Sequence, residues 1–166
     1  MSREGVFVFC KGDMVVYPHH GAAIVEDLVK LQKFGKKLTY IKLCFPHELT
    51  LMIPVGSVEE VGLRAVVTRD EADKVFDLLA EEASAMPVLW NQRFKTNLAK
   101  VVSGDVYEVA EVVRNLSLRK RTKDLSNAET RMLAKAREIL LSELIFVIDA
   151  TEESAEARVD RVLERT

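Results

Sequence analysis

The residues Val67-Thr68-Arg69-Asp70-Glu71 mark the point where the periodicity of the chain changes. Thr68 and Glu71 have the spacing of a capping box, in which two side chains satisfy the first backbone N–H groups of a helix. Before this point apolar residues come in short runs between turn residues, and after it they recur every three or four positions. We therefore predict an α+β chain with two modules, residues 1–67 and residues 68–166.

The first module has the pattern of a small, strongly bent β-barrel. Apolar runs at residues 6–9, 14–17, 22–29, 38–43 and 49–53 are separated by turn residues, and each run predicts a strand. Short strands at this spacing are typical of SH3-like and Tudor-like folds.

The last of these strands ends at Pro54, which has no amide hydrogen and suits a strand end or an edge. An edge strand over residues 50–53 would be free to pair with a strand of another protein. Protection of this edge by the chain's own loops is the alternative.

The second module has the periodicity of an all-α unit of about five helices. We expect helices over residues 68–83, 88–102, 106–119 and 127–148, and a last one capped by Thr151. Residues 119–123 are expected to form an exposed basic linker. In the second helix the residues expected to be buried are Leu89, Phe94, Leu98, Val101 and Val102.

Charge is distributed unevenly, although the formal net charge is only −2. Residues 91–137 carry eleven basic and five acidic side chains, whereas residues 68–90 and 138–166 are both acidic. A basic segment between acidic ones favours one local anionic partner over general adhesion. Mutual neutralisation between neighbouring helices is the alternative.

The single Trp of the chain, Trp90, directly precedes polar and basic residues. A flat apolar ring flanked by cations can insert beside bases while the cations hold phosphates. On this stretch alone a buried Trp is the more common arrangement. The residues that could contact DNA are Trp90, Gln92, Arg93, Lys95, Lys100, Arg119, Arg121, Arg131 and Lys135.

Few residues suit catalysis or a cofactor. His19, His20 and His47 fall in predicted turns without a second ligand one helical turn away, and no phosphate-binding loop or nucleophile motif is present. We therefore expect neither an enzyme nor a bound cofactor or metal.

Cys10 and Cys44 lie in apolar company and are expected to be reduced and buried in a cytoplasmic protein. A disulfide or a metal site is the alternative. No apolar run approaches the length of a membrane span, so no membrane partner is expected.

Seven blocks of sequence follow one another along nearly the whole chain: GDMVVYPHHGAA at 12–23, Ile53-Pro54, VGLR at 61–64, WNQRFK at 90–95, SGDV at 103–106, AEVVRNL at 110–116 and LSNAETRML at 125–133. In this order they resemble the CarD/CdnL family of bacterial transcription regulators. The resemblance implies a Tudor-like domain, shared with transcription-repair coupling factors, that binds the RNA polymerase β subunit. It also implies a compact helical domain that contacts promoter DNA.

By this resemblance, Trp90 stands where the family's Trp wedges into the minor groove at the upstream edge of the melted bubble. There it stabilises the open complex formed with the housekeeping sigma factor. Arg93 and Lys95 match basic positions of the family, whereas Gln92 stands where relatives often carry Arg.

On the polymerase side, the resemblance assigns Pro54 to a position important for β-subunit binding. Met52 and Leu31 stand where some relatives use Arg, so the contact here would be more apolar. It would run through Met52 and the backbone of the strand that also contains Leu51 and Ile53.

The leading hypothesis is a non-enzymatic cytoplasmic regulator that docks on RNA polymerase with its β module and contacts promoter DNA with its helical module. A protein–protein adaptor without DNA contact is the alternative, in which Trp90 is a core residue or a protein hot spot. We expect a monomer, with a domain-swapped dimer through the edge strand as the alternative.

Overall fold

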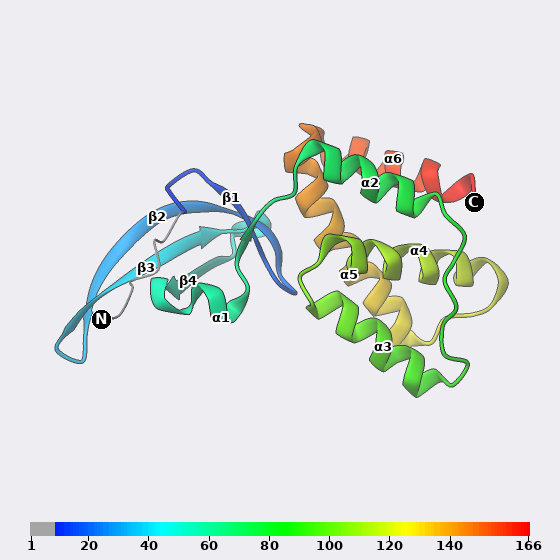
Figure 1. Cartoon of the computed structure of the whole chain (residues 1–166), viewed down its shortest axis with the longest axis horizontal. Coiled ribbons are helices and arrows are strands. Elements are labelled where there is room, and N and C mark those ends of the chain that lie inside the picture. The colour runs from blue at the N-terminus through cyan, green and yellow to red at the C-terminus, as the bar shows by residue number, and fades with distance from the viewer. Residues whose placement is uncertain (1–8) are drawn as a thin grey trace.

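The computed structural model describes residues 9–166. Their first part is a five-stranded antiparallel sheet in the order β4-β3-β2-β1-β5. The strands are β1 (Met14–Tyr17), β2 (Gly21–Lys33), β3 (Lys36–Cys44), β4 (Thr50–Pro54) and β5 (Arg64–Ala65). Figure 1 shows that β2 and β3 curve strongly and together form a long hairpin. Of the predicted run at 6–9, residues 6–8 lie outside the described residues and Phe9 is not in a strand.

Short helical elements follow β3 and β4, and they were not predicted from the sequence. They are η1 (Pro46–Glu48), η2 (Val55–Ser57) and α1 (Val58–Val61). The side chains of Val58 and Leu63 are buried with the inward side chains of the strands and close the core of this module.

Five helices follow the sheet, and α5 contacts each of the other four, as can be followed in Figure 1. They are α2 (Arg69–Leu79), α3 (Trp90–Val102), α4 (Val106–Thr122), α5 (Asn127–Ile148) and α6 (Glu152–Glu164). Thr68 forms a complete capping box, as predicted, and Ser126 forms a second one at the start of α5. Asp105 and Thr151 cap α4 and α6. The predicted α+β architecture is confirmed.

The predicted basic linker at residues 119–123 is wrong. Helix α4 continues to Thr122, because this segment contains no Gly or Pro and consists of good helix formers. The expected burial of the thiols is also corrected, since Cys10 and Cys44 are both free and exposed. Cys44 alternates with the buried Leu43 along β3 and therefore points out of the sheet.

A polar contact joins the sheet to α5. The guanidinium of Arg64 donates to both carboxylate oxygens of the buried Glu143, over 2.7 and 3.0 Å. The backbone N–H of Ala22 donates to Ser142 Oγ over 2.9 Å. A Cβ atom at Gly21 would lie 2.6 Å from the same oxygen, so only glycine lets β2 approach α5 this closely.

None of the helices among the described residues combines the length and the apolar character needed to cross a membrane.

Candidate functional site

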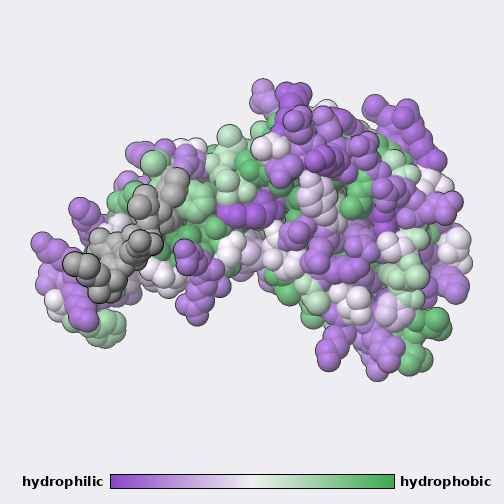
Figure 2. All heavy atoms as spheres, viewed as in Figure 1, coloured by the Kyte–Doolittle hydropathy of each residue, from purple (hydrophilic) through white to green (hydrophobic). Residues whose placement is uncertain are grey.

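Trp90 begins α3 at the end of the helical module that lies farthest from the sheet, and 48% of its surface is exposed. The two preceding residues are also exposed, Val88 to 92% and Leu89 to 59%. Figure 2 shows apolar side chains gathered at the lower right, where Figure 1 places the start of α3. The indole stacks on the ring of Phe94, with centroids 5.7 Å apart and planes at 20°.

The face of α3 that is buried in the core contains two polar residues. Arg93, Asn97 and Val101 recur every four positions and are all buried. This choice of inward face places Trp90 and Phe94 along the rim of the helix. The expectation that the apolar residues of α3 are buried is therefore corrected for three of them, which are exposed: Leu89, Leu98 and Val102.

The expected phosphate contact of Arg93 is corrected as well, because its side chain lies inside the protein. Its Nε donates to Glu129 Oε1 of α5 over 2.5 Å, and both side chains are at least 95% buried. Its Nη1 donates to the carbonyl oxygens of Pro87 and Val88 over 3.3 and 3.0 Å. Arg93 thus fixes the segment that leads into Trp90.

Glu129 connects this ion pair to the indole through Ser126. Glu129 Oε2 accepts from the backbone N–H of Ser126, and Ser126 Oγ accepts from the N–H of Glu129. Trp90 Nε1 donates to the same Ser126 Oγ over 2.9 Å. A chain of contacts therefore runs from Arg93 through Glu129 and Ser126 to the indole.

The carboxylate of Glu129 is kept ionised in this position. Its burial alone would raise its pKa, but the guanidinium of Arg93 and the backbone N–H of Ser126 outweigh burial and hold the pKa below its usual value.

In the first turn of α3 one backbone N–H, that of Gln92, donates to a side chain, Asn91 Oδ1, over 2.9 Å. Leu89 occupies the N-cap position and makes no side-chain hydrogen bond there, whereas α2, α4, α5 and α6 are each capped by a Thr, Asp or Ser. The positive end of the helix dipole favours an anion at this position.

The remaining basic candidates differ in how free they are. Gln92, Lys95 and Arg131 are exposed, and no ion pair is recorded for either of the two cations in residues 9–166. Lys100 pairs with Glu111 of α4 over 2.8 Å. Arg121 donates to the carbonyl oxygen of Leu163 over 2.7 Å, at the end of α6.

Arg119 is half-buried, and its Nε is a buried nitrogen for which no hydrogen-bond partner is found among the described residues.

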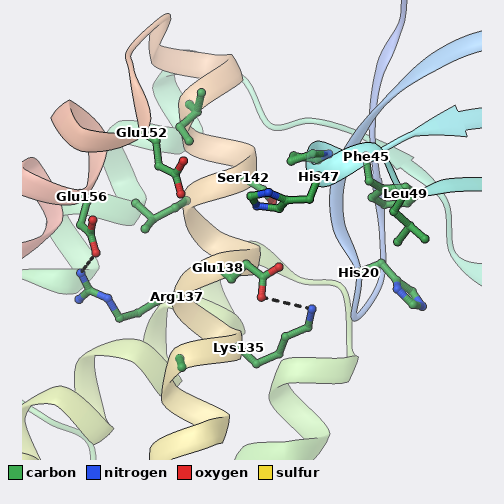
Figure 3. Close-up of a pocket in the computed structure, with 14 residues that line it drawn as sticks. His20, Phe45, His47, Leu49, Lys135, Arg137, Glu138, Ser142, Glu152 and Glu156 are labelled. Carbon is green, nitrogen blue, oxygen red and sulfur yellow. Dashed lines mark hydrogen bonds and ion pairs between the residues drawn. The ribbon is translucent and has the colours of Figure 1, made fainter.

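Lys135 lies away from Trp90. It is nine residues beyond Ser126 along α5, or about 13 Å at the rise of an α-helix. Its Nζ is 3.5 Å from Glu138 Oε2, at the edge of a cavity of about 440 Å³ between α5 and the sheet. Figure 3 shows that His47 reaches into this cavity from the turn after β3.

Arg137, which also lines this cavity, contacts Glu156 and Asp160. Within residues 9–166, no three His, Cys, Asp or Glu side chains are grouped closely enough to hold a metal ion.

Strand β4 is an edge of the sheet, as predicted. The register pairs Met52 with Lys42 and Pro54 with Tyr40. Directly opposed residues share a face, so Met52 and Pro54 lie on the outer face of the sheet. Tyr40 is in turn opposite Val29 of β2, and Leu31 follows two positions later on the same face.

The expectation that Leu51 and Ile53 take part in docking is corrected by this register. They are opposite the buried Leu43 and Ile41 and so face the core, where Ile53 is 5% exposed. The outer face therefore offers Met52, Pro54 and Leu31 as side chains, while Leu51 and Ile53 contribute only backbone to the edge.

Sequence reasoning missed the buried polar residues that hold the segment leading to Trp90. Arg114 of α4 is 3% exposed and donates to the carbonyl of Leu78 and to Ser84 Oγ, over 3.1 and 2.5 Å. Asn115 Oδ1 accepts from the backbone N–H of Ser84 over 3.1 Å. These contacts pin the segment between α2 and α3, and nothing in the local sequence announces that an Arg is buried.

Two family models match the chain. The CarD-like/TRCF RID domain matches residues 9–67, and the C-terminal domain of CarD matches residues 74–160. The chain belongs to the CarD family. It is 33% identical over 147 residues to "Putative transcription factor YdeB" of Bacillus subtilis (strain 168), covering 87% of this chain and 95% of that protein. This CarD family member is thus of a transcription-factor type.

Proposed function

We propose that this CarD family protein is a non-enzymatic regulator of transcription initiation. Residues 1–67 dock on the β subunit of RNA polymerase, and residues 68–166 contact promoter DNA at the upstream edge of the melted bubble. Trp90 enters the minor groove there and lengthens the life of the open complex formed with the housekeeping sigma factor. The protein acts as a monomer in the cytoplasm, bound to polymerase and DNA.

The observation that carries this proposal is the exposed but firmly held indole. Its ring stacks on Phe94, and its N–H is bound by Ser126 at the start of α5. A ring in this state loses little conformational freedom on binding, so its contact with DNA is favoured. An exposed indole costs hydration free energy in the free protein, which is consistent with a partner.

The charge around the ring supports DNA as that partner. The N-cap residue of α3, Leu89, makes no side-chain hydrogen bond, and the positive end of the helix dipole favours an anion there. Lys95 lies five residues beyond Trp90 on α3, and Arg131 lies five residues beyond Ser126 on α5. Both cations are exposed, and no ion pair holds either of them among residues 9–166, so they are free to attract the phosphates of a bound duplex.

A wedge changes the promoter equilibrium only through its different affinities for the two states. Closed duplex stacks its base pairs, whereas the upstream fork offers an unstacked step that an aromatic ring can fill. Base–aromatic stacking contributes about 1–3 kcal/mol, so the open complex would live roughly five to 150 times longer.

The edge strand β4 supports docking on the polymerase. Its edge is free to extend into a partner sheet by backbone pairing, and Met52 and Pro54 lie beside it on the outer face. The Met52 side chain is 42% exposed. A Met52→Glu substitution should weaken binding to the polymerase and leave binding to DNA unchanged.

The deciding experiment is the lifetime of open complexes on one promoter after a competitor challenge. Trp90→Ala should shorten the lifetime roughly tenfold, and Leu98→Ala, an exposed apolar change two turns further along α3, should not. Equal lifetimes for wild type and Trp90→Ala would reject the wedge.

Salt dependence separates this proposal from an adaptor without DNA contact. Phosphate contacts release counterions, so the affinity for a forked promoter fragment should fall steeply with salt. Tight binding to an acidic protein together with no measurable binding to DNA at low salt would favour the adaptor.

A further inference from the structure

The end of the β2–β3 hairpin carries a fully exposed aromatic residue. Phe34 is 99% exposed and forms the turn together with Gly35. Figure 1 shows this turn at the far left, at the opposite end of the molecule from α3. Residues 28–38 contain four lysines and no acidic residue, and Figure 2 shows hydrophilic side chains at this end.

Two features of this turn are unfavourable in the free protein. Phe34 has φ +51° and Gly35 has φ +73°, the left-handed conformations of a type I′ hairpin turn. Asn suits the first of these positions and a bulky aromatic does not. In addition, Lys33 lies directly opposite Lys36, and opposed like charges destabilise a hairpin.

The turn continues the outer face that contains Met52 and Pro54. Leu31 and Leu38 are directly opposed, and the same face carries Lys33 and Lys36 two positions closer to the turn. Leu31 and Leu38 are 36% and 39% exposed. A continuous strip therefore runs from the β4 edge to an apolar pair and then to two lysines, next to the turn that contains the exposed Phe34.

We propose that this hairpin end is a second anchor on RNA polymerase, in which Phe34 enters an apolar pocket with an acidic rim. Lys33 and Lys36 contact the carboxylates of that rim. Their mutual repulsion and the strain at Phe34 are offset by the contacts made on binding. The anchor rests on the proposed function, because its partner is the polymerase that the β4 edge binds.

The shape of the strip favours a protein surface over nucleic acid. Its centre is formed by Leu31, Leu38 and Tyr40, and Lys33 and Lys36 lie at the hairpin end, as in a protein interface with an apolar core and a charged rim. Lys42, at the other end of the strip, pairs with Glu26 over 3.1 Å. Single-stranded nucleic acid is bound by grooves that combine several aromatic platforms with cations along the backbone path. This face carries the aliphatic Leu31 and Leu38 next to the lysine pair, and its one aromatic ring among the described strands, that of Tyr40, lies under Lys33 Nζ at 5.7 Å from the ring centroid.

The test uses the full chain and core RNA polymerase without DNA, so that Trp90 does not contribute. Phe34→Asn removes the ring and places the preferred Asn-Gly pair in the turn, so the hairpin is retained. We expect its Kd for the polymerase to rise about tenfold or more, as for an aromatic hot spot. Phe34→Tyr retains the ring and should bind within about threefold of wild type.

The lysines are tested by charge reversal. The double variant Lys33→Glu/Lys36→Glu should also weaken binding about tenfold or more, and low salt should enlarge the difference. The matched control Lys11→Glu/Lys74→Glu changes the same charge at exposed positions away from the hairpin and should bind like wild type.

Three outcomes would overturn the anchor. Wild-type affinity for both Phe34→Asn and the lysine double variant, with Met52→Glu impaired, rejects the anchor and leaves the proposed function intact. Equal weakening of binding to promoter DNA alone, with polymerase binding unchanged, assigns the hairpin to nucleic acid instead. No binding of the wild-type chain to core polymerase rejects both the anchor and the docking role.

Discussion

Removing the hydroxyl of Ser126 should loosen Trp90 and destabilise the helical module together. Ser126 Oγ accepts one hydrogen bond from the backbone N–H of Glu129 and one from Trp90 Nε1. Ser126→Ala removes the N-cap of α5, which costs about 1 kcal/mol. It also removes the bond to the indole, which contributes about 0.5 kcal/mol because water can reach the half-exposed ring.

The chain provides a matched control for the cap. Thr68 caps α2 with the same capping box, and within residues 9–166 no aromatic side chain donates to its hydroxyl. Both helices contribute to one core, so both variants report on the same folded unit. In urea unfolding, Ser126→Ala should lose about 1.5 kcal/mol and Thr68→Ala about 1 kcal/mol.

A double-mutant cycle isolates the contact between the two side chains. Trp90→Phe retains an aromatic ring without its N–H, so Ser126→Ala should cost about 0.5 kcal/mol less in that background. Circular dichroism provides the signal in all four proteins.

Fluorescence of the single Trp gives an independent measurement. In Ser126→Ala the indole should be quenched more readily by acrylamide and should have lower anisotropy, because one of its two fixed contacts is lost. Additive free energies together with unchanged quenching would refute the idea that Ser126 holds the ring. Open-complex lifetime should fall in Ser126→Ala more than in Thr68→Ala.

Four further substitutions, of which Glu138→Gln is a control, test the other contacts. Glu129→Gln leaves the buried Arg93 unpaired and should cost about 3 kcal/mol in urea unfolding at pH 7. The pKa of Glu129 is lowered in the folded protein, so its contribution to the free energy of unfolding is fully present above about pH 4.3 and is lost as the pH falls through the folded pKa. In Glu129→Gln, the pH dependence of stability in this acid range should be smaller by this contribution. Glu143→Gln should cost about 2 kcal/mol, whereas Glu138→Gln, at an exposed pair, should change stability by less than about 0.5 kcal/mol. Phe34→Asn should raise the free energy of unfolding by about 1 kcal/mol, because Asn adopts the left-handed backbone conformation of this position more readily than Phe does. An equal or lower thermal midpoint would contradict backbone strain at the turn.

The elements with local signals could be predicted from the sequence. Helix α5 begins after Ser126, where Ser126 and Glu129 form a capping box within four consecutive residues. The predicted span of this helix, residues 127–148, agrees with the structure. Strands β1 and β4 were also found from short apolar runs that end at Pro18 and Pro54. These signals need no knowledge of distant residues.

The faces of the elements could not be predicted in the same way. Apolar periodicity alone predicted that Leu89 and Leu98 face the core, but the structure exposes them and buries Arg93. Charged side chains are buried only when they are paired. The partner of Arg93, Glu129, is 36 residues away along the chain. For β4 the strand was predicted, but separating Met52 from Ile53 required the register with β3.

Helix α5 links the two proposed interfaces through two buried carboxylates. Glu129 binds Arg93 and supports the mount of Trp90, whereas Glu143 binds Arg64 at the end of the sheet. The two are fourteen residues apart on one continuous helix, about 21 Å along its axis. In the proposed complex Trp90 meets a DNA fork while the sheet is held on the polymerase, so the distance between Trp90 and the sheet has to be fixed. The directional ion pairs at Glu129 and Glu143 fix this distance along α5. Apolar packing alone would fix it less well, because it lets packed elements slide. Weakening either ion pair, Arg93–Glu129 or Arg64–Glu143, should therefore shorten the lifetime of the open complex without altering any residue that is proposed to touch polymerase or DNA.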